Sequence, residues 1–246
     1  TVAVKILTSE AAAEVETVKR FTREAALAKS LDHPGLVRVL DHGTERGIHW
    51  MVMELVDGVT LESVIDSKGA MDWKEAVHLA TQIGRALAYL AEHGVIHRDV
   101  KPANILLGHK GIVKLSDLGF AKDLAPTGST EGLTMAGSSM GSPAYMAPEQ
   151  VIDAKNVTAS ADVYGLGASL YHMLCGETPF TGRNAYQVME QVVKNPHTPP
   201  RERNPNLPVS LATFLDWSLE KNPQNRPADA ATFVRELEAI AAAPNA

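Results

Sequence analysis

The chain has 246 residues, of which 45% are hydrophobic and 21% charged, and its formal net charge is −6. This composition is typical of a globular protein that can bury a sizeable core in one large domain or two smaller lobes. The acidic balance argues against nucleic-acid binding as a primary role, and we expect no nucleic-acid partner. No apolar run approaches the ~20 residues of a membrane span, so no membrane segment is expected within this chain.

The first part of the chain predicts a small, β-rich lobe with one helix. Alternating apolar residues predict a strand over 2–7, and apolar positions at helical spacing predict a helix over 14–31. His33-Pro34-Gly35 ends this helix, because proline disfavours helical backbone at the residue before it. Two further strands are predicted over 36–41 and 48–55.

From Leu61 onward the pattern is mainly helical. An amphipathic helix is predicted over 73–93, and short strands are predicted around a loop within 95–114. Residues 123–142 are rich in Ser, Thr, Gly and Met without any period, which predicts a long functional or mobile loop. The remaining predictions are helices over 161–175, 211–220 and 228–242 and a proline-rich loop over 196–208. The one cysteine, Cys175, falls at the end of an apolar helix and is expected to be a buried thiol, in keeping with a reducing compartment.

Three short segments carry the chemistry. The run His-Arg-Asp-Val-Lys-Pro-Ala-Asn occupies 97–104, Asp117-Leu118-Gly119 follows it, and Ala147-Pro148-Glu149 comes later. Asp99 can accept the proton of an attacking hydroxyl. Asn104 and Asp117 offer the oxygen ligands that magnesium prefers.

These segments, in this order and at these spacings, resemble the active-site motifs of the eukaryote-like serine/threonine protein kinases of bacteria. The resemblance covers essentially the whole chain, although Leu118 stands where phenylalanine is usual. It implies an α+β, bilobal protein-kinase-like fold with a partial N-lobe over 1–55, a hinge over 56–60 and a larger, mainly helical C-lobe over 61–246. The family's Gly-rich phosphate loop belongs upstream of Lys5, so we expect the sequence to begin inside the N-lobe and, as it stands, to bind ATP poorly.

The same resemblance implies the activity and its cofactors. The expected reaction moves the γ-phosphate of ATP to Ser or Thr hydroxyls of protein substrates, with Mg²⁺ as the metal and Mn²⁺ as an alternative. Lys101, two residues after the base Asp99, is expected to neutralise the transferring phosphate and is typical of kinases that act on Ser and Thr. Lys5 is expected to contact the α- and β-phosphates and to pair with Glu24 on the following helix, as a switch.

The nucleotide pocket is expected by resemblance alone. Met53 corresponds to the residue that gates the back of the adenine site, and Glu54 and Leu55 would offer backbone groups to the adenine edge. Ala3 and Leu106 would cover the two faces of the ring.

Regulatory and structural roles follow in the same way. Arg98 is expected to pair with a phosphate on the long loop, and the preferred acceptor is Thr134 among the residues Thr127, Ser129, Thr130, Thr134, Ser138 and Ser139. Ser142 is expected to touch Asp99 and Lys101. Glu149 and Arg226 are expected to form a buried ion pair, and Asp162 to brace the backbone of the catalytic loop.

Two alternatives stay open at this level. One is a pseudokinase or scaffold that binds partners without transferring phosphate, and the other is a small-molecule phosphotransferase. The intact set of Lys5, Asp99, Asn104 and Asp117 argues against the first alternative, and the Ala147-Pro148-Glu149 segment against the second. We further expect a cytoplasmic location, which could be that of the cytoplasmic domain of a membrane-anchored protein, and a dimer for autophosphorylation.

Overall fold

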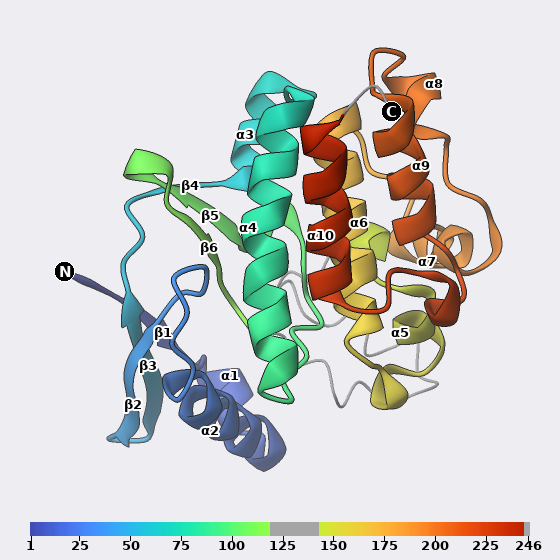
Figure 1. Cartoon of the computed structure of the whole chain (residues 1–246). Helices are drawn as coiled ribbons and strands as arrows, with labels where there is room; N and C mark the ends of the chain where they lie inside the picture. The colour runs from blue at the N-terminus through green and yellow to red at the C-terminus, as the bar shows by residue number, and fades with distance from the viewer. Residues whose placement is uncertain (119–142, 244–246) are drawn as a thin grey trace.

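The computed structural model describes residues 1–118 and 143–243. Figure 1 shows a small lobe of strands and one long helix beside a larger lobe in which several long helices stand side by side. The predicted fold class, a small β-rich lobe joined to a mainly helical one, is confirmed.

The small lobe is an antiparallel sheet in the order β1-β3-β2 with helix α2 against it. Its elements are β1 (Val2–Ile6), α1 (Ser9–Ala12), α2 (Val15–Lys29), β2 (Val39–Glu45) and β3 (Ile48–Glu54). Lys5 lies opposite Met51 in the β1–β3 register. The lobe buries only a small apolar cluster, formed by Phe21, Ala25, Val39 and Met51.

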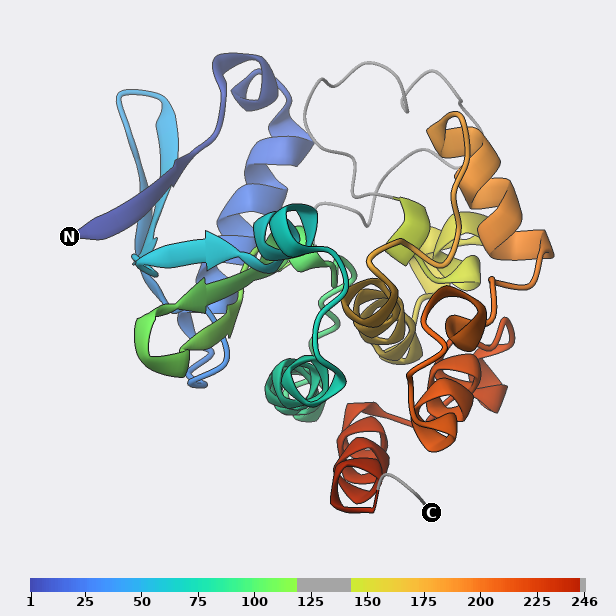
Figure 2. The ribbon, with the colours of Figure 1, turned by 90° about the horizontal axis from the view of Figure 1, so that it is seen from above.

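A second antiparallel sheet, in the order β4-β5-β6, joins the small lobe to the large one. Its strands are β4 (Gly58–Thr60), β5 (Ile105–Gly108) and β6 (Val113–Leu115). It lies between the two lobes when the molecule is seen from above (Figure 2). The catalytic loop, residues 97–104, leads directly into β5, and Asp117 lies two residues after the end of β6.

The large lobe is built around α6 (Ser160–Cys175), whose residues from Ala161 to Leu174 are all buried. A helix that is apolar all round is stable only inside a core, and α6 packs against α4, α9 and α10. Helix α4 begins after Asp72, whose carboxylate accepts the N–H groups of Lys74 and Glu75. The other helices of this lobe are α3 (Leu61–Lys68), α4 (Trp73–Glu92), α5 (Pro148–Ile152), α7 (Ala185–Lys194), α8 (Pro200–Arg203), α9 (Val209–Ser218) and α10 (Ala230–Ala242).

Some boundaries differ from the sequence predictions. Of the hinge predicted over 56–60, the last three residues, Gly58 to Thr60, form strand β4, because they pair with β5. The strand predicted over 36–41 begins only at Val39, since Leu36 forms a single parallel bridge to Leu115 instead. The loop predicted over 196–208 contains the short helix α8. In the described part of the chain, no helix combines the length and apolar character that crossing a bilayer requires.

Candidate active site

A buried carboxylate at the start of α6 fixes the backbone of the catalytic loop by hydrogen bonds. Asp162 accepts the backbone N–H of His97 at 2.8 Å and that of Arg98 at 2.7 Å. Burial raises the pKa of Asp162 to about 6, while the two N–H donors act in the opposite direction. Asp162 is thus where the sequence placed it, and it fixes the loop backbone directly before Asp99.

His97 packs inside this loop and links it to the segment that carries Asp117. The residue is fully buried, its Nδ1 accepts the N–H of Asp99 at 3.2 Å, and its Nε2 donates to the carbonyl of Ser116 at 3.0 Å. These two bonds fit a neutral ring protonated on Nε2. The ring therefore orients the backbone on both sides of the site and has no visible part in proton transfer.

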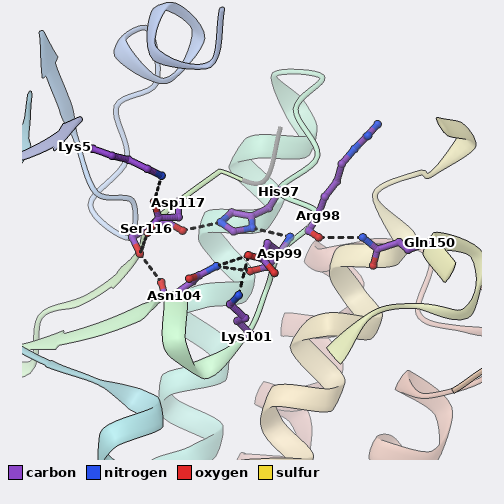
Figure 3. Close-up of polar contacts among 9 residues, drawn as sticks. All are labelled: Lys5, His97, Arg98, Asp99, Lys101, Asn104, Ser116, Asp117 and Gln150. Carbon is purple, nitrogen blue, oxygen red and sulfur yellow. Dashed lines mark hydrogen bonds and ion pairs between the residues drawn. The ribbon is translucent and has the colours of Figure 1, made fainter. Parts of the chain in front are cut away.

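Two other residues of the catalytic loop, Lys101 and Asn104, contact the carboxylate of Asp99 (Figure 3). Asn104 Nδ2 donates to Asp99 Oδ2 at 3.0 Å and to the Asp99 carbonyl at 2.8 Å. Lys101 Nζ lies 3.1 Å from the same Oδ2, and its side chain is only 7% exposed. These contacts fix the position of the Asp99 carboxylate, which is the group expected to accept the proton.

Asp117 lies beside this group in a left-handed backbone conformation, with φ of 55°. Its Oδ2 accepts the Ser116 hydroxyl at 3.2 Å, and its Oδ1 pairs with Lys5 Nζ at 2.5 Å. Burial alone would raise the pKa of Asp117, but Lys5 and Ser116 together outweigh burial and hold the pKa below its usual value. Ser116, which sequence reasoning missed, also donates its backbone N–H to the carbonyl of Asn104 at 2.8 Å and so ties the two residues expected to bind the metal.

These two residues suit a magnesium ion. Since Asn104 Nδ2 makes the bonds to Asp99, the orientation of the amide is set, and no donor among the described residues occupies its Oδ1. One amide oxygen and one carboxylate are a sufficient protein contribution, because magnesium completes its shell with water and phosphate oxygens.

The expected Lys5–Glu24 ion pair is not formed. Lys5 pairs with Asp117 instead, and Glu24 Oε1 is buried with no hydrogen-bond partner within residues 1–118 and 143–243. Burial raises the pKa of Glu24 to about 7, even though Lys5 and Arg20 act to lower it. The physical reason is that the ammonium group of Lys5 is held by the carboxylate of Asp117 and so does not reach Glu24.

A cavity lies between α2, the small sheet and the end of β6. Lys5, Glu24, Met53 and Asp117 line it, together with apolar residues such as Leu36 and Leu118. Ala3 lies opposite Met53 in the β1–β3 register, and Leu106 lies on β5 opposite Thr60 and Lys114. Leu55 is 51% exposed at the end of β3.

The regulatory predictions are only partly within the described structure. Thr134, Ser142 and the other candidate acceptors of the long loop lie outside the described residues. Arg98 has a positive φ of 65°, and its side chain extends away from Asp99 (Figure 3). Gln150, a residue not expected from the sequence, donates to the Arg98 carbonyl at 3.0 Å.

The predicted Glu149–Arg226 ion pair is present. Arg226 Nη1 and Nη2 donate to the two carboxylate oxygens of Glu149 at 2.6 and 2.7 Å. The Arg226 side chain is fully buried, and it also donates to the carbonyls of Glu220, Ser160 and Lys221. This pair joins α5 to the segment before α10.

Comparison with known proteins decides the family. The sequence model of the family described as the protein kinase domain matches residues 1–237. The chain belongs to the protein kinase family. It is 39% identical over 240 residues to the serine/threonine-protein kinase PknB of Mycobacterium tuberculosis, covering 96% of this chain and 38% of PknB. The serine/threonine-protein kinase PrkC of Bacillus subtilis is 38% identical over 226 residues, covering 92% of this chain and 34% of PrkC.

A solved structure of a protein kinase fold agrees with this assignment. The crystal structure of Rad53 1-466 in complex with AMP-PNP superimposes with a TM-score of 0.76 at 27% identity, covering 96% of this chain and 57% of that one. The chain spans only about a third of the length of PknB and of PrkC. These relatives lend no support to the scaffold alternative, since both are named as kinases.

Proposed function

We propose that this chain is the catalytic domain of a serine/threonine protein kinase that uses ATP and a divalent metal, with Mg²⁺ as the preferred ion and Mn²⁺ as a substitute. The observation that carries the proposal is the convergence of Lys101 and Asn104 on one oxygen of Asp99, within 3.1 Å. The protein forms no covalent bond to the phosphate in this kind of phosphoryl transfer. The main catalytic requirement is therefore the positioning of charged groups, which these contacts provide.

In the proposed reaction, Asp99 accepts the proton of a Ser or Thr hydroxyl while the hydroxyl oxygen bonds to the γ-phosphorus. The bond from that phosphorus to the bridging oxygen of ADP breaks, and the negative charge leaves on ADP. Lys101 offsets charge on the transferring group, and Asn104 keeps the Asp99 carboxylate in place. Asn104 and Asp117 would hold the metal, which supplies neutralisation of the phosphate charge.

Lys5 is proposed to exchange partners during this cycle. Its ammonium group leaves Asp117 for the α- and β-phosphates, where Glu24 is the proposed second partner. Such an exchange would make Asp117 available as a metal ligand at the moment when nucleotide binds. The backbone at Glu54 and Leu55, with Ala3, Met53 and Leu106 around the ring, is the proposed adenine site.

The function is tested by following transfer of labelled γ-phosphate from Mg-ATP to a generic basic protein, using the full-length protein. The label should be recovered as phosphoserine and phosphothreonine after acid hydrolysis, and removal of metal by a chelator should abolish it. A folded protein that binds Mg-ATP but transfers no label would instead be a scaffold.

We also propose activation by autophosphorylation at Thr134 between two copies of the protein in the cytoplasm. Arg98 supports this, because it extends away from Asp99 and can receive a phosphate without disturbing the base. In the active arrangement, Ser142 is proposed to contact Asp99 and Lys101.

Mass spectrometry of the protein after incubation with ATP should find phosphate on Thr134, and Thr134→Ala should slow transfer to other proteins. Phosphate absent from Thr134 in an active sample would refute this site.

A further inference from the structure

An ion pair outside the catalytic group joins strand β6 to the end of β3. Lys114 Nζ, on β6, donates to Glu54 Oε1 at 2.5 Å and to the carbonyl of Leu36 at 3.1 Å. Both side chains are largely shielded, with exposed fractions of 16% for Lys114 and 29% for Glu54. Such a pair is less screened by water and salt than one at the surface.

The Glu54 carboxylate is also fixed to the segment that follows α2. Its Oε1 accepts the N–H of Arg38 at 2.8 Å, and the N–H of Glu54 donates to the Arg38 carbonyl at 2.9 Å. Glu54 thus binds two other parts of the chain at once, one through its side chain and backbone and the other through Lys114.

The backbone completes this junction. The N–H of Leu115 donates to the Gly35 carbonyl at 2.8 Å, and the N–H of Val37 donates to the Leu115 carbonyl at 2.9 Å. Three pieces of chain therefore meet at Lys114. They are the end of β3, the segment 35–38 after α2, and strand β6, which leads to Asp117 three residues later.

These three pieces carry the two ends of the proposed nucleotide site. The end of β3 presents the backbone groups at Glu54 and Leu55 proposed for adenine, whereas β6 presents Asp117, proposed for the metal and phosphates. A ligand that contacts both ends binds tightly only if their separation is fixed before binding, because otherwise the ligand must order them at its own cost.

We propose that Lys114 is a positioning residue for nucleotide binding, which fixes the adenine end of the site relative to its phosphate end. This inference rests on the proposed function, since it assumes that ATP occupies this site. Loss of the ammonium group leaves the half-buried carboxylate of Glu54 with the Arg38 N–H alone, so that it turns toward water and the end of β3 becomes free to shift.

The test compares Lys114→Met, Lys114→Arg and wild type in the full-length protein, by calorimetric binding of Mg-ATP and of adenosine. The matched control is Lys29→Met, which also removes an ion pair of the small lobe, the exposed Lys29–Asp41 pair of 2.8 Å. We expect Lys114→Met to weaken Mg-ATP binding at least 5-fold and adenosine binding less than 2-fold, because adenosine contacts only one end. Lys114→Arg, which keeps the charge, and Lys29→Met should bind Mg-ATP within 2-fold of wild type.

Equal effects on Mg-ATP and adenosine, or no effect on either, would overturn the inference even if Lys114→Met melts at a lower temperature. In steady state the expected change is in KM for ATP, with kcat largely kept. A wild-type protein that binds Mg-ATP without transferring phosphate would defeat the proposed function while the binding comparison still decides the role of Lys114. A wild type that binds no adenine nucleotide would defeat both.

Discussion

At the scale of single residues, the distribution of charge around Lys5 defines the state of the site. Among the described residues, Lys5 pairs with the carboxylate of Asp117, while Glu24 lines the same cavity with a buried oxygen for which that part of the chain offers no hydrogen-bond partner. A buried ionised carboxylate without a partner is costly, and protonation relieves that cost. The buried carboxyl of Glu24 is therefore favoured in its protonated form, and the proposed move of Lys5 away from Asp117 would favour the Glu24 anion.

The raised pKa of Glu24 makes a prediction about stability and pH. Between its ordinary value of 4.5 and its folded value of about 7, the folded state holds more protons at Glu24 than the unfolded state does. The free energy of unfolding contributed by this group therefore falls as pH rises through that window. Glu24→Gln cannot ionise, so it should be more stable than wild type by about 1–2 kcal/mol at pH 8, after allowance for partial exposure, and by far less at pH 5.

Thermal unfolding at the two pH values, without nucleotide, measures this difference. Glu16→Gln on the same helix is the control, because Glu16 is solvent-exposed and Lys19 lowers its pKa instead. A Glu24→Gln protein that parallels wild type at both pH values would contradict the burial argument.

At the scale of elements, the Glu149–Arg226 pair joins α5 to the region before α10. Arg226→Met should lower the free energy of unfolding by about 3–5 kcal/mol, because it leaves Glu149 and several carbonyl groups without their donor. The matched control is Arg85→Met, which breaks the exposed Arg85–Glu238 pair between α4 and α10 and should cost about 1 kcal/mol or less. Urea unfolding of the three proteins gives the comparison, and equal losses in the two variants would contradict it.

The elements also show how far sequence patterns reach. The helices α4, α6 and α10 were predicted close to their observed bounds, since each has a long, regular apolar pattern. Helix α7 was not predicted, although Asn184 caps it and Val188 and Val192 are its buried residues, because the segment is short and offers only a brief apolar pattern. Strand β2 was predicted too early because Leu36 lies at a parallel bridge to Leu115 of β6, and such a choice depends on tertiary contacts that no local pattern encodes.

The candidate site also contains some residues whose contacts the sequence could predict and others whose contacts it could not. The grouping of Asp99, Lys101 and Asn104 could be predicted because the three lie within one short loop whose motif specifies them. The partner of Lys5 could not, since Glu24 and Asp117 are both carboxylates near it and the choice depends on where α2 packs. Lys114 and Ser116 carry no motif signal, and only the folded chain reveals what they contact.

At the scale of the whole molecule, the two lobes are unequal in their apolar cores. The small lobe buries four residues of one cluster, whereas the large lobe buries a far larger cluster that includes Tyr164, Tyr171 and Phe233. Since local stability follows buried apolar contact, the small lobe should open at lower free energy than the large one.

Native-state hydrogen exchange tests this inequality. Amides of α4 and α6 should exchange last, near the free energy of global unfolding, and those of β1 and α2 should exchange well before them. Equal protection of α2 and α6 would show that the lobes unfold as one unit.

For the whole domain, we propose that Asp99 is the base of a phosphoryl transfer performed by a folded, nucleotide-binding protein. The most direct test is the single-turnover rate of phosphate transfer to a protein substrate by Asp99→Asn and by wild type, with Mg-ATP affinity measured on the same samples. We predict a loss of about 10²–10⁴ in rate with ATP affinity nearly unchanged, because Asn cannot accept the proton. A variant that transfers phosphate at the wild-type rate would contradict the assignment of Asp99 and with it the mechanism.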